Sequence, residues 1–156
     1  MFKFHFRRYA RELSMQIIFS YDIQDKLIKN ETVCDDLINY LQDLVILLNF
    51  KDLTYKYSHR IFRETLKITN GIFNHIEEID SLIERFSINW TMGRIDLISK
   101  SIIRVAIYEI LYCSNISINV SINESIEICK KYCASSDSYM FINGILNTIK
   151  EDVIKK

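Results

Sequence analysis

Basic side chains gather at the N-terminal end of a sequence that is otherwise electrically neutral. The 156 residues have a formal net charge of zero, so any nucleic-acid binding must come from a local patch. Residues 1–16 carry Lys3, Arg7, Arg8 and Arg11 against Glu12, a net charge of +3. Arg7 and Arg11 are four positions apart with Arg8 beside them, which predicts a short basic edge on a helix. This edge is either a nucleic-acid contact or an ordinary solvated surface.

Acidic side chains gather in a second region, residues 77–84. Glu77, Glu78 and Glu84 lie mainly outside the apolar stripe of this segment. They therefore form either a solvated face or a docking surface for a basic protein.

Residue types that could bind metal or perform catalysis are scattered. Cys129 and Cys133 are four positions apart on an expected helix, but no second pair with metal-ligand spacing accompanies them. His5, His59 and His75 are isolated, and no phosphate-binding loop, nucleophile elbow or H-E-x-x-H motif occurs. We expect reduced core thiols, no metal, no cofactor and no enzymatic activity. With no signal peptide and no membrane-spanning run, we also expect a cytoplasmic protein.

The elements that position these residues are predicted to be helices, because the chain has no proline and only three glycines. Apolar periodicity predicts helices over 6–24, 32–48 and 57–86, the last being one helix or two divided near Asn70-Gly71. Residues 87–94 are the expected joint, with Trp90 filling the seam between two bundles. The expected domains are thus an N-terminal bundle, 1–86, and a C-terminal bundle, 87–156, packed as one unit.

The segment from Ile102 to Leu111 is apolar almost all round, which predicts a buried central helix over 96–113. Its two charges, Arg104 and Glu109, need partners on neighbouring segments. Ser121 and Glu124 have the spacing of a capping box that opens the next helix.

The last helix is expected to begin with Asp137 or Ser138 as its N-cap and to bury Phe141, Ile145, Ile149 and Val153. Gly144 in its middle suggests close helix packing at that point.

Several blocks together resemble the NusB transcription antitermination factors. They are residues 7–12 (RRYARE), Asn89-Trp90 with Arg94, residues 103–109 (IRVAIYE), residues 122–127 (INESIE) and residues 141–146 (FINGIL). The blocks follow the family's order and cover nearly the whole chain.

The resemblance implies an all-α fold of two small helical bundles in one compact NusB-like domain. It also implies a protein that binds the boxA element of nascent ribosomal RNA together with NusE, a small-subunit ribosomal protein, within the RNA polymerase antitermination complex. Arg7, Arg8 and Arg11 would contact phosphates, which position RNA without reading its sequence. The segment from Asp137 to Phe141 would complete the RNA face, and Phe141 would either stack on a base or belong to the core. Glu77, Glu78 and Glu84 are the candidate surface for NusE.

The chain also departs from the family. Tyr9 and Met140 stand where basic residues are common, so the expected face has less positive charge. One alternative is a detached domain like the NusB-like domain of RNA cytosine methyltransferases, although the chain ends at Lys156 without a cofactor-binding domain. The other alternative is a helical adaptor that binds only proteins. The sequence does not determine the oligomeric state or the RNA sequence preference.

Overall fold

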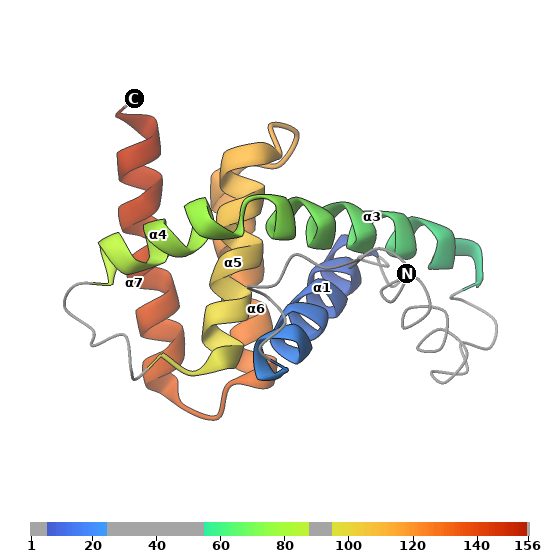
Figure 1. Ribbon diagram of the computed structural model, residues 1–156, viewed down its shortest axis with the longest axis horizontal. Helices are drawn as coiled ribbons and strands as arrows, with labels where there is room; N and C mark the ends of the chain where they lie inside the picture. The colour runs from blue at the N-terminus through green and yellow to red at the C-terminus, as the bar shows by residue number, and fades with distance from the viewer. Residues whose placement is uncertain (1–5, 25–54, 88–94, 156) are drawn as a thin grey trace. The chain divides into compact units, whose positions relative to one another are not determined.

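The computed structural model describes residues 6–24, 55–87 and 95–155, and within these ranges it contains only α-helices (Figure 1). They are α1 (Phe6–Ile23), α3 (Tyr55–Asn74), α4 (Ile76–Phe86), α5 (Leu97–Tyr112), α6 (Ile118–Tyr132) and α7 (Ser136–Ile154). The predicted all-α class is confirmed. The predicted helix over 32–48 and the seam role of Trp90 lie outside the described residues. No helix within the described ranges is both long and apolar enough to cross a membrane.

The chain divides into two compact units, residues 1–73 and residues 74–156. This division lies earlier than the predicted boundary between 86 and 87. The reason is that the helical pattern over 57–86 breaks at His75, whose backbone is not helical (φ −123°, ψ 20°). Helix α4, which follows the break, packs against α5 and α7 and so belongs to the second unit. Asn70-Gly71, the expected break, lies inside α3.

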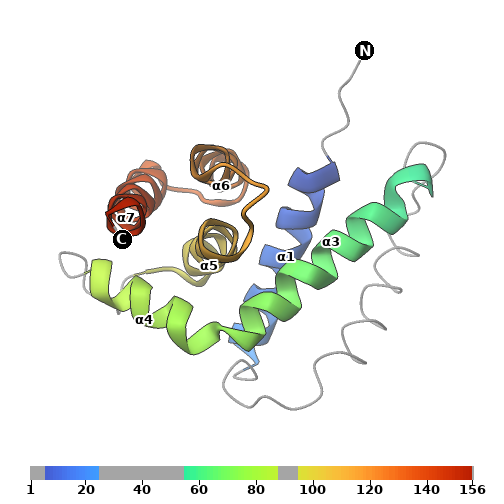
Figure 2. The same cartoon turned by 90° about the horizontal axis from the view of Figure 1, so that it is seen from above.

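The first unit is built on α1 and α3. Ile17 of α1 is fully buried and packs against Phe62 and Leu66 of α3, and the ring of Tyr21 lies edge-on to that of Phe73 at 5.1 Å between centroids. Successive positions on α1 meet successive positions on α3, so the two helices run in the same general direction (Figure 2).

Buried hydroxyl groups in this unit are satisfied by the helix backbone. Ser14 Oγ donates to the Ala10 carbonyl at 2.8 Å and lies 3.4 Å from the Thr65 carbonyl of α3. Thr65 and Thr69 donate to the carbonyls of Ile61 and Thr65, four residues earlier. Because no hydroxyl among these three is left without an acceptor, small polar residues can be buried here at little cost.

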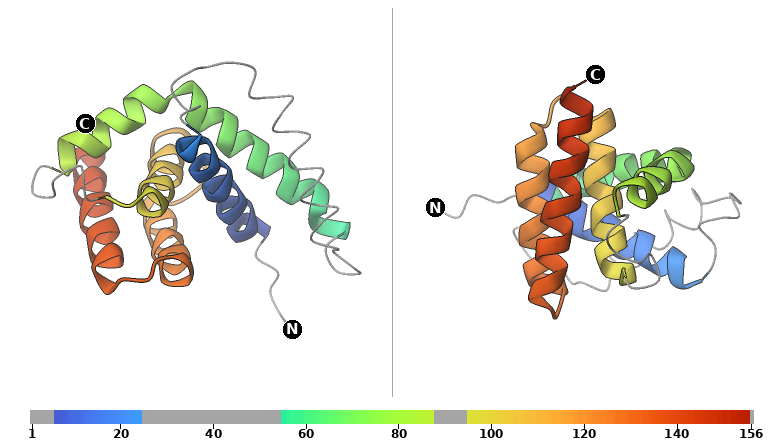
Figure 3. Two further views of the ribbon diagram at one scale, coloured as in Figure 1. Left: turned by 60° about the horizontal axis from the view of Figure 1, so that its bottom comes forward. Right: turned by 90° about the vertical axis from the view of Figure 1, so that its left-hand side faces the viewer.

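Helix α5 is the centre of the second unit. It contacts α4, α6 and α7, and every residue from Ser101 to Ile110 is buried. The helices α5, α6 and α7 lie side by side (Figure 3), and α4 lies across α5 and α7 (Figure 2). Burial of an isoleucine such as Ile103 or Ile107 contributes roughly 1.5–3 kcal/mol, so this helix supplies much of the core. Its N-cap is Asp96, whose side chain accepts a hydrogen bond from Ser99 N at 2.8 Å.

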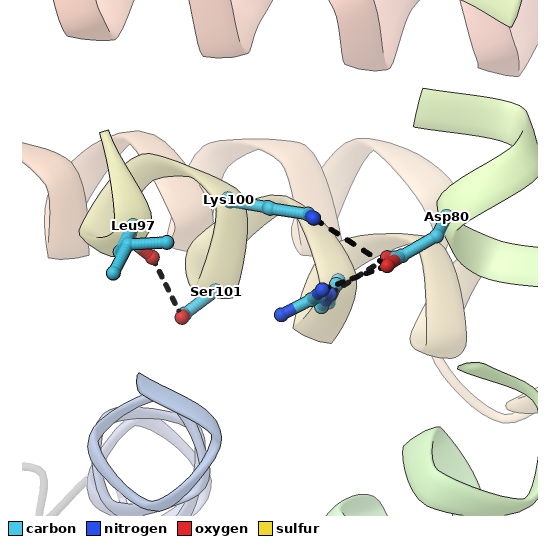
Figure 4. A network of polar contacts seen from close by, with 5 residues as sticks. Asp80, Leu97, Lys100 and Ser101 are labelled. Carbon is cyan, nitrogen blue, oxygen red and sulfur yellow. Dashed lines mark hydrogen bonds and ion pairs between the residues drawn. The ribbon is translucent and has the colours of Figure 1, made fainter. Parts of the chain in front are cut away.

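The two charges of α5 tie it to its neighbours, as predicted. Arg104, 2% exposed, donates from Nε and Nη2 to the two carboxylate oxygens of Asp80 on α4, each at 2.7 Å. Lys100 lies 3.5 Å from the same carboxylate (Figure 4). Glu109, also 2% exposed, accepts a hydrogen bond from Ser121 Oγ of α6 at 2.5 Å.

The predicted capping box at Ser121 is therefore wrong. Helix α6 already begins at Ile118 with Ser117 as its N-cap, so the backbone N–H of Ser121 bonds to the Ser117 carbonyl inside the helix. The hydroxyl of Ser121 is then available to Glu109, a bond that local sequence spacing does not reveal.

Two expectations about α7 are also corrected. Its N-cap is Ser135, whose hydroxyl accepts from Asp137 N at 3.1 Å, so the helix begins before the expected cap at Asp137 or Ser138. Gly144 is exposed, and a Cβ added there would meet no described atom within 4 Å, so it does not mark close helix packing. Of the predicted buried stripe, Phe141, Ile145 and Ile149 are buried, whereas Val153 is only half-buried.

Candidate nucleic-acid interface

The three arginines of α1 differ in exposure. Arg7 is exposed and Arg8 is half-buried, but Arg11 is 3% exposed. Glu12, next to Arg11, is buried as well. The exposed positive charge of α1 is thus concentrated in its first turn, and Arg11 does not share a solvent-exposed edge with Arg7.

An aromatic ring at the start of α1 holds two guanidinium groups. Arg7 Cζ lies 5.9 Å from the centroid of the Phe6 ring, and Arg60 Cζ of α3 lies 4.9 Å from the same centroid. Cations are attracted to the face of such a ring by its quadrupole. The first turn of α1 therefore continues, through Phe6, onto α3.

Helix α3 adds basic residues that the sequence reasoning missed. Arg60, Arg63 and Lys67 are all exposed and are spaced at i, i+3 and i+7, which places them on one side of the helix. Ile61, Ile68 and Ile72 are buried on the other side. The signal was present in the sequence, since the same periodicity that identifies the apolar stripe also identifies the side opposite to it.

In the second unit, the segment predicted to complete the RNA face, Asp137 to Phe141, lies in the first turns of α7, directly after the turn from α6. Asp137 is exposed in the first turn of α7, where a negative charge suits the helix dipole. Phe141 is only 6% exposed, so it lies in the core. Exposed side chains at this turn are instead Tyr139, 40% exposed, and Met140, 53% exposed.

Basic and aromatic groups lie on both sides of the turn between α6 and α7. At the end of α6, Lys131 Nζ lies 5.1 Å from the centroid of the Tyr132 ring. Lys130 pairs with Glu127 at 2.7 Å, which raises the pKa of Lys130, and Tyr139 of α7 acts in the same direction on that pKa from across the turn. A surface that combines lysines with an exposed ring is typical of single-stranded nucleic-acid contacts.

The acidic residues of α4 separate into two kinds. Glu77 and Glu84 are exposed and seven positions apart, so they share one side of the helix. Glu78 is also exposed, but its carboxylate accepts a hydrogen bond from the Tyr112 hydroxyl of α5. Burial, followed by this bond to Glu78, raises the pKa of Tyr112 to about 12. The ring of Tyr112 also stacks on that of His75 at 4.1 Å between centroids.

The predicted site residues thus fall into three groups. Arg7 and Arg8 belong to the first unit, Asp137 to the start of α7, and the acidic residues to α4. A face shared by the arginines and the turn stays a prediction.

The described cysteines do not form a metal site. Cys113 and Cys129 are buried, Cys133 is half-buried, and none of the three is in a disulfide. Burial, followed by a hydrogen bond with Cys133, raises the pKa of Cys129 to about 12, so its thiol stays protonated at neutral pH. Within residues 6–24, 55–87 and 95–155, no three His, Cys, Asp or Glu side chains lie together in a way that could hold a metal ion.

Comparison with known proteins gives a consistent result. The model of the NusB family matches residues 8–151. Among named relatives, transcription antitermination protein NusB of Acetivibrio thermocellus is 36% identical over 143 residues, which is 92% of this chain and 87% of that protein. Its namesake in Chloroherpeton thalassium is 34% identical over 150 residues; this chain spans only 64% of that protein's length.

Solved structures share the fold. A NusB structure from T. maritima is 28% identical and superposes with a TM-score of 0.70 over 93% of this chain and 90% of that one. A structure of antitermination factors NusB and NusE in complex with dsRNA contains a chain that is 20% identical, with a TM-score of 0.71 over 94% of this chain and 97% of that one. The matched family model spans nearly all of the described helices, and the fold agrees with it. This chain belongs to the NusB family.

Proposed function

We propose that this protein is an RNA-binding transcription antitermination factor that binds boxA of nascent ribosomal RNA together with NusE and supports read-through by RNA polymerase. Membership of the NusB family is the observation that carries the proposal. Support also comes from the structural neighbour that is a complex of NusB and NusE with dsRNA. This role is non-catalytic and belongs in the cytoplasm, where RNA is transcribed.

In this proposal, different side chains contact different parts of the RNA. Arg7 and Arg8 contact phosphates and supply affinity that falls with salt, because each contact releases counterions. At the α6–α7 turn, Tyr139 replaces the buried Phe141 as the ring that stacks on a base. Asp137, exposed beside it, can accept hydrogen bonds from base edges.

For the NusE contact we propose the exposed side of α4 that carries Glu77 and Glu84. Glu78 is engaged with Tyr112 of α5, and its first role is to hold α4 against α5. Reversing the charge with Glu77→Lys and Glu84→Lys together should weaken NusE binding without changing RNA binding measured in its absence. Unchanged NusE binding would move the contact elsewhere.

The test is a binding titration of the purified protein against a boxA-containing single-stranded RNA and a scrambled control, each with and without NusE. We expect tighter, sequence-dependent binding when NusE is present. A lack of preference in both conditions would contradict the proposal and leave a helical adaptor that binds only proteins.

Variants identify the groups that touch RNA. Arg7→Ala should weaken binding with little loss of stability, because Arg7 is exposed. Tyr139→Ala should weaken it by about 1–3 kcal/mol, the usual contribution of one stacked base. Phe141→Ala should instead destabilise the fold by about 3–5 kcal/mol, as expected for a buried aromatic residue. Lys155→Ala, which removes an exposed charge near the C-terminal end of α7, is the matched control.

A further inference from the structure

The exposed side of α3 carries a row of positive charge that the family's sequence blocks do not include. Arg60, Arg63 and Lys67 are exposed and lie on the same side of the helix. Long basic side chains on one side of a helix are commonly solvated surface, so the row needs a connection to a binding site before it has a function.

Phe6 supplies that connection. The guanidinium carbons of Arg7 and Arg60 lie 5.9 Å and 4.9 Å from the centroid of its ring, which limits their separation to at most about 11 Å. This upper bound is comparable with the Debye length of about 8–10 Å near physiological salt, so an anion between the two guanidinium groups would be attracted by both. Their mutual repulsion costs free energy in the unbound protein, and a phosphate group placed between them would offset it.

The row also supplies charge where α1 lacks it. Arg11 is buried, and Tyr9 is an exposed neutral residue on the same helix. The exposed positive charge near Arg7 therefore comes largely from α3, which places three cations along about two turns of helix.

We infer that Arg60, Arg63 and Lys67 of α3 extend the first turn of α1 into one phosphate-binding surface for single-stranded RNA. The inference rests on the proposed function and deepens it. The surface follows the RNA backbone, so it contributes affinity and no sequence preference. Glu64, half-buried between Arg60 and Lys67 on the same helix, opposes this binding with its negative charge.

The experiment measures RNA binding against salt for the intact protein and for the triple variant Arg60→Ala, Arg63→Ala, Lys67→Ala. The probe is the same boxA-containing single-stranded RNA, with its scrambled control. Each lost phosphate contact lowers the slope of log K against log salt by about 0.7 for a single strand, so the triple variant should lose about 2 from the slope. It should lose affinity for both RNAs by the same factor.

A change of opposite sign gives a second readout. Glu64→Gln removes the negative charge and should tighten binding to both RNAs. Lys155→Ala, which removes an exposed cation from the second unit, should change neither the slope nor the affinity. Thermal unfolding of the triple variant should differ little from that of the intact protein, because all three side chains are exposed and the lost contact of Arg60 with the Phe6 ring contributes little at an exposed site.

The outcomes separate this inference from the proposed function. If the intact protein shows no salt-dependent RNA binding, both fail. If Arg7→Ala lowers the slope while the triple variant keeps it, the proposed function stands and the role of α3 is overturned. If the triple variant keeps its RNA affinity but loses NusE binding, the row contacts a protein and the inference is again overturned.

Discussion

Removing the Asp80 carboxylate should lower the free energy of unfolding strongly, because this one group pairs with the buried side chain of Arg104. Arg104 is 2% exposed, whereas the Asp80 side chain is 26% exposed and has Lys100 3.5 Å away. Asp80→Ala leaves a guanidinium group buried on α5 without its two 2.7 Å bonds, and we expect a loss of about 3–5 kcal/mol in the free energy of unfolding.

The partner substitution should be milder. Arg104→Met keeps much of the buried volume, and the Asp80 that remains can be hydrated and can stay near Lys100, so we expect a loss of about 1–2 kcal/mol. The double variant should be about as stable as Arg104→Met alone, because no buried charge is left behind. The coupling energy of the cycle should therefore equal the loss in Asp80→Ala, about 3–5 kcal/mol, which is at or above the upper end for residues in contact.

Urea unfolding followed by far-UV circular dichroism measures all four proteins. The matched control is Arg85→Ala, which breaks an ion pair from α4 to Asp152 of α7 at 3.4 Å with Arg85 58% exposed. Pairs of this exposed kind contribute about 0–1 kcal/mol. If Asp80→Ala cost no more than Arg85→Ala, or if the two losses simply added in the double variant, burial of Arg104 would not be the cause of the effect.

Three further outcomes follow from single contacts. Gly144→Ala should stabilise the protein by about 1 kcal/mol, measured by thermal unfolding, because the added Cβ meets no described atom within 4 Å; destabilisation would mean that this surface is covered. Ser121→Ala should cost about 1.5–3 kcal/mol in urea unfolding, because it removes the hydrogen bond to the buried Glu109; a loss of a few tenths would indicate that the bond contributes little. The pKa of Tyr112 is raised from 10.0 to about 12, so the stabilisation by the protonated Tyr112 hydroxyl is complete below pH 10 and is lost as the pH rises toward 12. The intact protein should therefore lose stability relative to Tyr112→Phe between about pH 10 and about pH 12. Parallel pH profiles of the two proteins would contradict the raised pKa of Tyr112.

The burial of a residue could be predicted from the sequence wherever it depends mainly on the pattern of neighbouring residues along the same helix. The run from Ile102 to Leu111 is apolar on most of its circumference, so its central position could be predicted, and its two charges could be expected to need partners. Which partners they have could not be predicted. Asp80 is 24 positions from Arg104 and Ser121 is 12 positions from Glu109, and periodicity within one helix does not specify such pairs.

Helix ends were less predictable than helix existence. Ser117, Ser121 and Ser135 are all chemically able to cap a helix, and neighbouring residues make several starting points acceptable. With the helix starting after Ser117, the hydroxyl of Ser121 bonds to Glu109 of α5, which is a tertiary contact. For α3 and α4, the break at His75 instead of Asn70-Gly71 accompanies stacking of its ring on Tyr112 of α5.

For the candidate site, prediction from the sequence was limited in another way. A motif identifies candidate residues, but only exposed side chains can contact RNA, and the motif does not say which of them are exposed. Arg7 and Arg11 are both in the arginine block that resembles the family, yet one is exposed and the other is buried. Four-residue spacing places two side chains on the same side of a helix but does not say how far the surrounding chain covers that side. Phe141 was decidable from the sequence, since it begins the stripe that continues with Ile145 and Ile149, and a residue in that stripe points to the core. Measurements of RNA binding should therefore be compared with the exposure of each side chain, and Arg11→Ala should be interpreted through its effect on folding before any loss of binding is assigned to a lost phosphate contact.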